Sequence, residues 1–310
     1  MKVATFNKFN DLQITEQEIA SNSALGASSI TSGYFLNAKK APKTTSSNRY
    51  GIAVIIGNGN YEGYGQGVPN VDFAHNDAEA IKQYVLTSLG YMDGNIIFLK
   101  DARHADLVST FGVAGNEKGK IFDWIRKGKS DVFVYYSGHG APSLDSGRGY
   151  LLSVDADPQR VELSGYPLDT LYENLSKLPA KSITVVMDAC FSGSSQEGSV
   201  VTNASSISLP QVEPKLNLPN ATILTAAGLS EVASWDTTAK LGLFTKNFLQ
   251  GVYGEADKDI FGNNDGTVTL AELKEYLTEE VPYQARRNYG REQNAQIVGN
   301  QDLVMSTLAN

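Results

Sequence analysis

Two short stretches decide how this chain is interpreted: YYSGHG at residues 135–140 and DACFSG at residues 188–193. Each follows a run of apolar, β-branched and aromatic residues, which is typical of strands buried on both faces of a parallel sheet. Ligands of such sheets bind beyond the carboxyl ends of the strands. The sequence therefore predicts that His139 and Cys190, the only cysteine of the chain, meet at one edge of a sheet.

The rest of the pattern predicts an α/β fold. Apolar runs indicate strands at 51–57, 95–101, 131–136, 149–154, 183–187 and 221–227. Apolar residues spaced by three and four indicate helices at 74–89, 107–111, 119–127, 168–178, 243–252 and 270–281. This alternation of strands and helices is typical of a mostly parallel central sheet flanked by helices.

Composition narrows the class of protein. The chain has 310 residues with 41% hydrophobic and 19% charged residues, which suits a globular protein with one large core or two modest ones. Its net charge of −8 speaks against nucleic acid or an anionic membrane as a partner. No apolar run approaches the roughly 20 residues of a membrane helix, and no secretion signal is recognisable. A single cysteine excludes an internal disulfide, so the fold does not need an oxidising compartment. Without a recognisable secretion signal we expect a cytoplasmic protein, and we also expect a monomer.

Two segments depart from the core pattern. Residues 1–48 are rich in Ser, Thr, Asn and Ala and are interpreted as a mobile leader or pro-segment, or as a tail with no role. The folded domain is then 49–310. Residues 194–219 are dominated by small and polar types and predict a flexible loop between a large and a small part of this domain. Loops of this length are usually functional.

A cysteine and a histidine at neighbouring strand ends are the minimum parts of a thiol nucleophile. The thiolate is the reactive form, and a free thiol with a pKa of about 8.5 is mostly protonated at neutral pH. His139 could assist the Cys190 thiol and protonate the leaving amine. The backbone N–H groups of Gly140 and Cys190 are expected to be free to bind a developing oxyanion. The alternative is a buried structural cysteine and a loop histidine held by local hydrogen bonds.

Together, the two motifs strongly resemble those of the caspase-like peptidases, and within these the metacaspases and bacterial caspase homologues. The resemblance covers residues 50 to about 305. Besides the two motifs, it includes the opening strand, Asn76-Asp77-Ala78, residues 149–152 and residues 293–299. It implies a caspase–haemoglobinase fold and peptide-bond hydrolysis by a Cys–His dyad, in which Cys190 is the nucleophile and His139 the dyad histidine.

The residue two positions before the cysteine bears on substrate choice. Asp188 would pair with an Arg or Lys side chain and repel Asp. The resemblance to metacaspases implies that Asp77 and Ser137 line the same primary pocket, although Ala74 stands where metacaspases often have a cysteine. We expect peptide or protein substrates cleaved after Arg or Lys. The alternatives are an Asp-specific caspase, and a caspase-fold scaffold that binds without turnover.

Self-processing is a further expectation from the family, whose members often mature by cutting their own loops at basic residues. Lys215 is the only basic residue of the 194–219 stretch, and Lys40 and Lys43 lie just before the core. These three residues are the candidate self-cleavage sites. The alternative is that both stretches are simply flexible.

No cofactor is required for thiol chemistry, but calcium is a candidate activator. Residues 263–272 resemble the later part of an EF-hand loop, in which Asn263, Asp265 and Glu272 would be ligands. The first ligand position falls on Phe261, which cannot coordinate calcium. The alternative is a turn before a capped helix.

Overall fold

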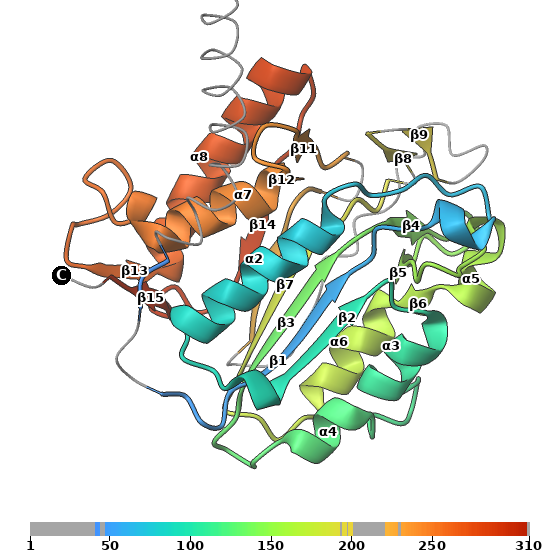
Figure 1. The fold of residues 1–310 in the computed structure, drawn as a ribbon, viewed down its shortest axis with the longest axis horizontal. Coiled ribbons are helices and arrows are strands. Elements are labelled where there is room, and N and C mark those ends of the chain that lie inside the picture. The colour runs from blue at the N-terminus through green and yellow to red at the C-terminus, as the bar shows by residue number, and fades with distance from the viewer. Residues whose placement is uncertain are drawn as a thin grey trace, which may run out of the picture.

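The computed structural model describes residues 41–43, 47–192, 194–196, 198–200, 221–228 and 231–308. Its centre is a six-stranded sheet with the strand order β14-β10-β7-β3-β1-β2 (Figure 1). These strands are β1 (Ile52–Gly57), β2 (Ile96–Lys100), β3 (Asp131–Ser137), β7 (Ser182–Asp188), β10 (Ala221–Thr225) and β14 (Gln296–Val298). All neighbours pair in parallel except β10 and β14, which are antiparallel. The predicted fold class is confirmed.

Helices cover both faces of the sheet, which explains why its strands are continuously apolar (Figure 1). One face carries α2 (Ala74–Thr87), α7 (Leu243–Gln250) and α8 (Leu270–Tyr289). The other carries α3 (His104–Phe111), α4 (Lys120–Trp124) and α6 (Leu168–Ser176). Successive residues of β1 point to opposite faces, so that Ala53 and Ile55 join the first core and Ile52, Val54 and Ile56 the second.

Smaller elements surround this core. The short strands form separate sheets: β4 (Gly140–Pro142), β5 (Gly149–Leu151) and β6 (Tyr166–Pro167); β8 (Ser194–Ser195) and β9 (Gly198–Ser199); β11 (Trp235–Asp236) and β12 (Leu241–Gly242); β13 (Thr267–Thr269) and β15 (Val304–Thr307). The remaining helical segments are η1 (Glu62–Tyr64), η2 (Asp93–Asn95), η3 (Pro158–Arg160), α5 (Val161–Ser164) and the π-helical turn η4 (Gly251–Glu255). None of the described helices combines the length and apolar character that crossing a bilayer requires.

Two features differ from the sequence-based expectation. The strand expected at 149–154 ends at Leu151, because the Leu152 N–H turns to the carbonyl of His139 at 3.0 Å. The folded region also begins earlier than residue 49. Ala41 and Pro42 are buried, and the Ser88 hydroxyl at the end of α2 donates to the Pro42 carbonyl at 2.9 Å. Residues 1–40, Lys40 included, and 44–46 of the expected leader lie outside the described residues, and so do Lys215 and most of the 194–219 stretch.

Candidate active site

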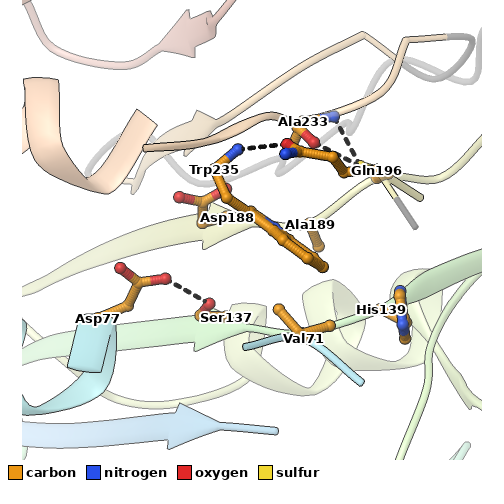
Figure 2. A pocket seen from close by; sticks show the side chains of 11 residues that line it. Val71, Asp77, Ser137, His139, Asp188, Ala189, Gln196, Ala233 and Trp235 are labelled. Carbon is orange, nitrogen blue, oxygen red and sulfur yellow. Dashed lines mark hydrogen bonds between the residues drawn. The ribbon is translucent and has the colours of Figure 1, made fainter. Parts of the chain in front are cut away.

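The register of two neighbouring strands brings the two sequence motifs together. In the parallel pairing of β3 with β7, Ser137 lies opposite Asp188. The chain continues from each strand for two residues, to His139 and to Cys190, and both line one small pocket. Figure 2 labels His139 in this pocket. A side chain at position 140 could not be accommodated there, since its Cβ would lie 2.5 Å from the ring of Phe191. Gly140, the last residue of the YYSGHG motif, thus allows the two chain segments to approach closely.

The Gly140 N–H, which is a predicted oxyanion donor, is occupied in this conformation, and its role stays a prediction. This N–H donates to the carbonyl of Cys190 at 3.1 Å, as the close approach of the two strand ends requires. It is therefore not free to bind an oxyanion until this contact breaks. The second predicted donor, the N–H of Cys190, stays a prediction.

The His139 ring is fixed by a carbonyl and an aromatic side chain. Its Nε2 lies 2.8 Å from the Pro69 carbonyl. Because a carbonyl only accepts, Nε2 carries a proton, and a neutral ring then keeps its lone pair on Nδ1. The Tyr61 ring packs against the His139 ring, with 4.7 Å between the two centroids, and the Tyr61 hydroxyl accepts a hydrogen bond from the backbone N–H of His139. Burial lowers the pKa of His139 to about 4, so the ring is neutral at physiological pH and can act as a base.

The Cys190 thiol is held by a segment that follows β10. The Ala233 N–H donates to Sγ at 2.7 Å, and the side chain of Cys190 is packed into the core with 9% exposure. Burial raises the pKa of the thiol to about 12, and the negative charge of Asp188 also raises it, whereas the Ala233 N–H lowers it. No hydrogen bond joins this thiol to the His139 ring among the described residues. The raised pKa of the thiol and the lowered pKa of the imidazole favour the uncharged form of each group, and each group is hydrogen-bonded to another partner.

The three residues expected in the primary pocket lie together beside this pair (Figure 2). Asp77 comes from α2, Ser137 from β3 and Asp188 from β7. The Ser137 hydroxyl donates to Asp77 Oδ2 at 2.9 Å, and the N–H of Gly242 donates to Oδ1 at 2.8 Å. Asp188 Oδ2 accepts both the N–H and the hydroxyl of Thr245, at 3.0 and 2.7 Å.

Both carboxyl groups resist ionisation. Burial raises the pKa of Asp188 to about 6, against the hydrogen bonds from Thr245. Burial also raises the pKa of Asp77 well above its usual value, and the charge of Asp188 adds to the effect. The ion pairs found among the described residues include neither carboxylate. Two buried acids without a counter-charge suit a cation that arrives with a ligand.

Sequence reasoning identifies Ser137 but not the other two residues, Gly242 and Thr245, that donate to these carboxylates. Gly242 ends β12, and Thr245 lies in the first turn of α7, where it is fully buried among apolar neighbours. A polar residue inside an otherwise apolar helical stripe is a signal for such a role, but it does not say which partner the hydroxyl meets. The pocket is further lined by Val71, Gln196 and Trp235 (Figure 2). The backbone N–H of Trp235 donates to Gln196 Oε1 at 2.7 Å.

The candidate calcium loop has another structure. Glu272 Oε2 accepts the N–H and the hydroxyl of Thr269, at 2.8 and 2.9 Å, which is a capping box at the start of α8. Asn263 and Asp265 each accept a backbone N–H within the turn. The described residues contain no group of three or more His, Cys, Asp or Glu placed to hold a metal ion. The structure thus shows the alternative, a turn before a capped helix, and calcium dependence stays a prediction.

Comparisons with known proteins agree with this geometry. The model of the caspase domain family matches residues 50–300. Metacaspase III c of Phaeodactylum tricornutum is 29% identical over 168 residues, which are 49% of this chain and 44% of that protein. Metacaspase-1 of Eremothecium gossypii is 28% identical over 130 residues, 38% of this chain and 27% of that protein. The matches thus span less than half of either relative.

A solved structure is similar over most of the chain. Caspase-1 from Spodoptera frugiperda has a TM-score of 0.54 at 13% sequence identity, with 86% of this chain and 94% of that chain covered. At this identity the likeness concerns the fold.

The resting thiol makes the first testable prediction. Because the pKa of Cys190 is raised to about 12, we expect iodoacetamide to alkylate it at pH 8 about a hundredfold or more slowly than a cysteine peptide. The rate should still rise between pH 8 and pH 10. Since Cys190 is the only cysteine, intact-mass measurement follows it directly. The protein unfolded in urea is the control, and a rate in the folded protein that levels off near pH 8.5 would contradict the prediction.

Asp188→Asn should stabilise the protein at neutral pH. A carboxyl whose pKa is raised from 3.8 to about 6 on folding binds its proton more tightly in the folded state, so its contribution to stability falls as the pH rises from 4 through 6. The amide has no such loss, and we expect a gain of about 1–3 kcal/mol at pH 7 that shrinks towards pH 4. Thermal unfolding at both pH values measures it, with the exposed Asp169→Asn as control. An Asp188→Asn protein that is less stable than wild type at pH 7 would contradict the prediction that the ionised, buried Asp188 lowers the stability of the protein.

Proposed function

The chain belongs to the caspase domain family, and from this premise we propose that it is a cysteine endopeptidase that cleaves peptide bonds after Arg or Lys. The observation that carries the proposal is one pocket that contains a Cys–His pair and, beside it, two buried carboxylates without a counter-charge. The first pair supports the reaction, and the second supports the substrate class.

The chemistry follows from the tautomer of the histidine. With Nε2–H held by Pro69, the Nδ1 lone pair of His139 accepts the thiol proton of Cys190. The Sγ atom then attacks the carbonyl carbon of the scissile bond, and the resulting imidazolium returns the proton to the leaving amine. The thioester that remains is hydrolysed by water, which gives its proton to His139, and the thiol is restored with release of the carboxylic acid.

This reaction requires a rearrangement of the resting site. Sγ must leave the Ala233 N–H, and the Gly140 N–H must leave the Cys190 carbonyl before it can stabilise an oxyanion. Both contacts are hydrogen bonds of moderate net value, about 1 kcal/mol each. Substrate binding can therefore replace these two hydrogen bonds, which hold the resting site in an inactive arrangement.

The acidic pair explains the proposed preference. The described residues donate no hydrogen bond to Asp188 Oδ1, because Thr245 makes both of its bonds to Oδ2. An Arg or Lys side chain that enters the pocket supplies the missing positive charge and a donor for this oxygen. An aspartate side chain would instead meet two carboxyl groups of its own sign.

A binding protein without turnover is the second candidate, and one observation favours it. The thiol is buried with a pKa raised to about 12, and the His139 ring is bonded to Pro69 rather than to sulfur. An acyloxymethyl ketone with arginine next to the warhead distinguishes the two functions. A peptidase attaches this reagent covalently to Cys190, whereas a scaffold does not.

Cleavage of matched peptides tests the proposed function. We expect kcat/KM for a peptide with Arg or Lys before the scissile bond to exceed that for citrulline, the neutral analogue of Arg, by about 10²–10³-fold. Loss of one partner of a buried charge pair costs about 2–5 kcal/mol. The Asp peptide should not be cleaved, and Cys190→Ala and His139→Ala should abolish all cleavage. Equal rates for Arg and citrulline, or a preference for Asp, would refute the proposal.

Self-processing and calcium activation are tested on the full chain. Incubated wild-type protein should yield fragments that end at Lys40, Lys43 or Lys215, with calcium accelerating their appearance over chelator. Lys43 is exposed, as a cleavage site must be. Cys190→Ala is the control, and Lys→Gln variants at the three positions assign the cuts. A fragment pattern that Cys190→Ala shares with wild type would exclude self-cleavage.

A further inference from the structure

One buried side chain of α7 connects to the acidic pair but has no part in the proposed chemistry. Thr245 is fully buried, and its hydroxyl lies 2.7 Å from Asp188 Oδ2 and 2.6 Å from the hydroxyl of Tyr135. Tyr135 comes from β3 and is also fully buried. Three elements, β3, α7 and β7, therefore meet in one row of hydrogen-bonding groups.

The direction of this row can be assigned. A threonine hydroxyl has one proton to donate, and an ionised carboxylate only accepts. When Asp188 is ionised, the Thr245 proton therefore points to Oδ2, and the Tyr135 hydroxyl must donate to the Thr245 oxygen. Together with the Thr245 N–H, the row places two donors on one carboxylate oxygen. Donors of this kind favour the charged form and orient it.

The same segment also shapes the other carboxyl group. The Gly242 N–H donates to Asp77 Oδ1. A Cβ at position 242 would lie 2.1 Å from Asp188 Oδ2 and 3.2 Å from Asp77 Oδ2. No side chain is compatible with this closeness, so glycine is needed where β12 passes between the two acids. The segment 242–245 thus contacts both carboxyl groups.

We propose that Thr245 is a positioning residue for substrate selectivity: its hydroxyl, supported by Tyr135, fixes Asp188 so that the remaining oxygen binds the cationic side chain of the substrate. The inference rests on the proposed function. Thr245 does not touch the substrate. It acts through Asp188. Without the Thr245 hydroxyl the pocket keeps its shape, but Asp188 is more readily protonated to its neutral form.

Thr245→Val tests the proposal, because valine has nearly the shape of threonine and removes only the hydroxyl. We expect the Arg-to-citrulline ratio of kcat/KM at pH 7 to fall about tenfold, which corresponds to about 1.4 kcal/mol. The loss should appear in KM for the Arg peptide, while kcat for the citrulline peptide stays within about twofold. Thr245→Ser, which retains the hydroxyl, should restore the ratio to within about threefold of wild type.

The pH profile adds a readout that a structural role would not move. The titratable groups facing this site are Asp77 from α2, Tyr135 from β3, and His139 and Cys190 beyond the strand ends. The pKa values of about 4 for His139 and about 12 for Cys190 lie outside the range from pH 5 to pH 8.5. In that range the Arg-peptide KM profile follows the acidic pair of Asp77 and Asp188, which titrate together. Loss of the Thr245 hydroxyl removes a donor from the ionised form of this pair, so the midpoint should rise by about one pH unit in Thr245→Val. The citrulline profile should not shift.

Thr110→Val is the matched control. Thr110 is a buried threonine of α3, on the other face of the sheet, and its replacement should leave the ratio and the midpoint as in wild type. If Thr245→Val does not fold, Tyr135→Phe tests the same row and should shift both values in the same direction by a smaller amount.

The outcomes are separable. A wild-type protein without preference for Arg over citrulline overturns the proposed function. A wild-type preference that Thr245→Val and Tyr135→Phe both retain, with an unchanged pH midpoint, overturns only the role of Thr245. Equal losses on Arg and citrulline peptides also overturn it, because they indicate general damage to the fold. A selective loss on the Arg peptide that Thr245→Ser restores supports it.

Discussion

The parallel register between β3 and β7 is the constraint on which the site depends. Because Ser137 lies opposite Asp188, the residues two positions further along each chain reach the same edge of the sheet. A shift of the register by one residue would turn one of the two side chains towards the opposite face. Both strands are buried between helices on both faces, so the register is fixed by the whole core rather than by the pocket itself.

Burial has one consequence for every ionisable group of the pocket. It raises the pKa of the thiol and of both carboxyl groups, and it lowers the pKa of the imidazole, so each group prefers its uncharged form. The imidazole and the thiol are therefore uncharged at neutral pH, whereas Asp188, with a pKa of about 6, is the group that can carry a charge there. Besides the hydrogen bonds from Ser137, Gly242 and Thr245, a cationic substrate side chain would favour ionisation of the acids. The negative charge of Asp188 also raises the pKa of the neighbouring Cys190 thiol. A cation bound at Asp188 would therefore change the pKa of the thiol without touching it.

How much the sequence reveals depends on which interactions are local. The strands before His139 and Cys190 are long apolar runs that end in small residues, so both the fold class and the meeting of these residues can be predicted from pattern. The contact of Ala233 with the thiol and that of Gly242 with Asp77 join residues 43 and 165 positions apart. Nothing in their local sequence encodes such a distance. Gly140 illustrates the limit in another way: its place beside the cysteine is predictable, but the carbonyl that occupies its N–H is not.

If the buried acidic pair binds a substrate cation, as proposed, its burial lowers the stability of the protein, and the arrangement of the pair gives a reason for this loss. Each carboxyl group loses hydration on folding, and the two repel when both are ionised. A single exposed carboxylate would bind Arg or Lys at less loss of stability, but water and salt would screen it, and it would exclude an acidic side chain only weakly. In the pocket, the hydrogen bonds from Ser137, Gly242 and Thr245 offset part of the loss and use three of the four carboxylate oxygens. Under the proposed function, a substrate cation would relieve the uncompensated remainder, so selectivity for charge would arise from the instability of the empty site.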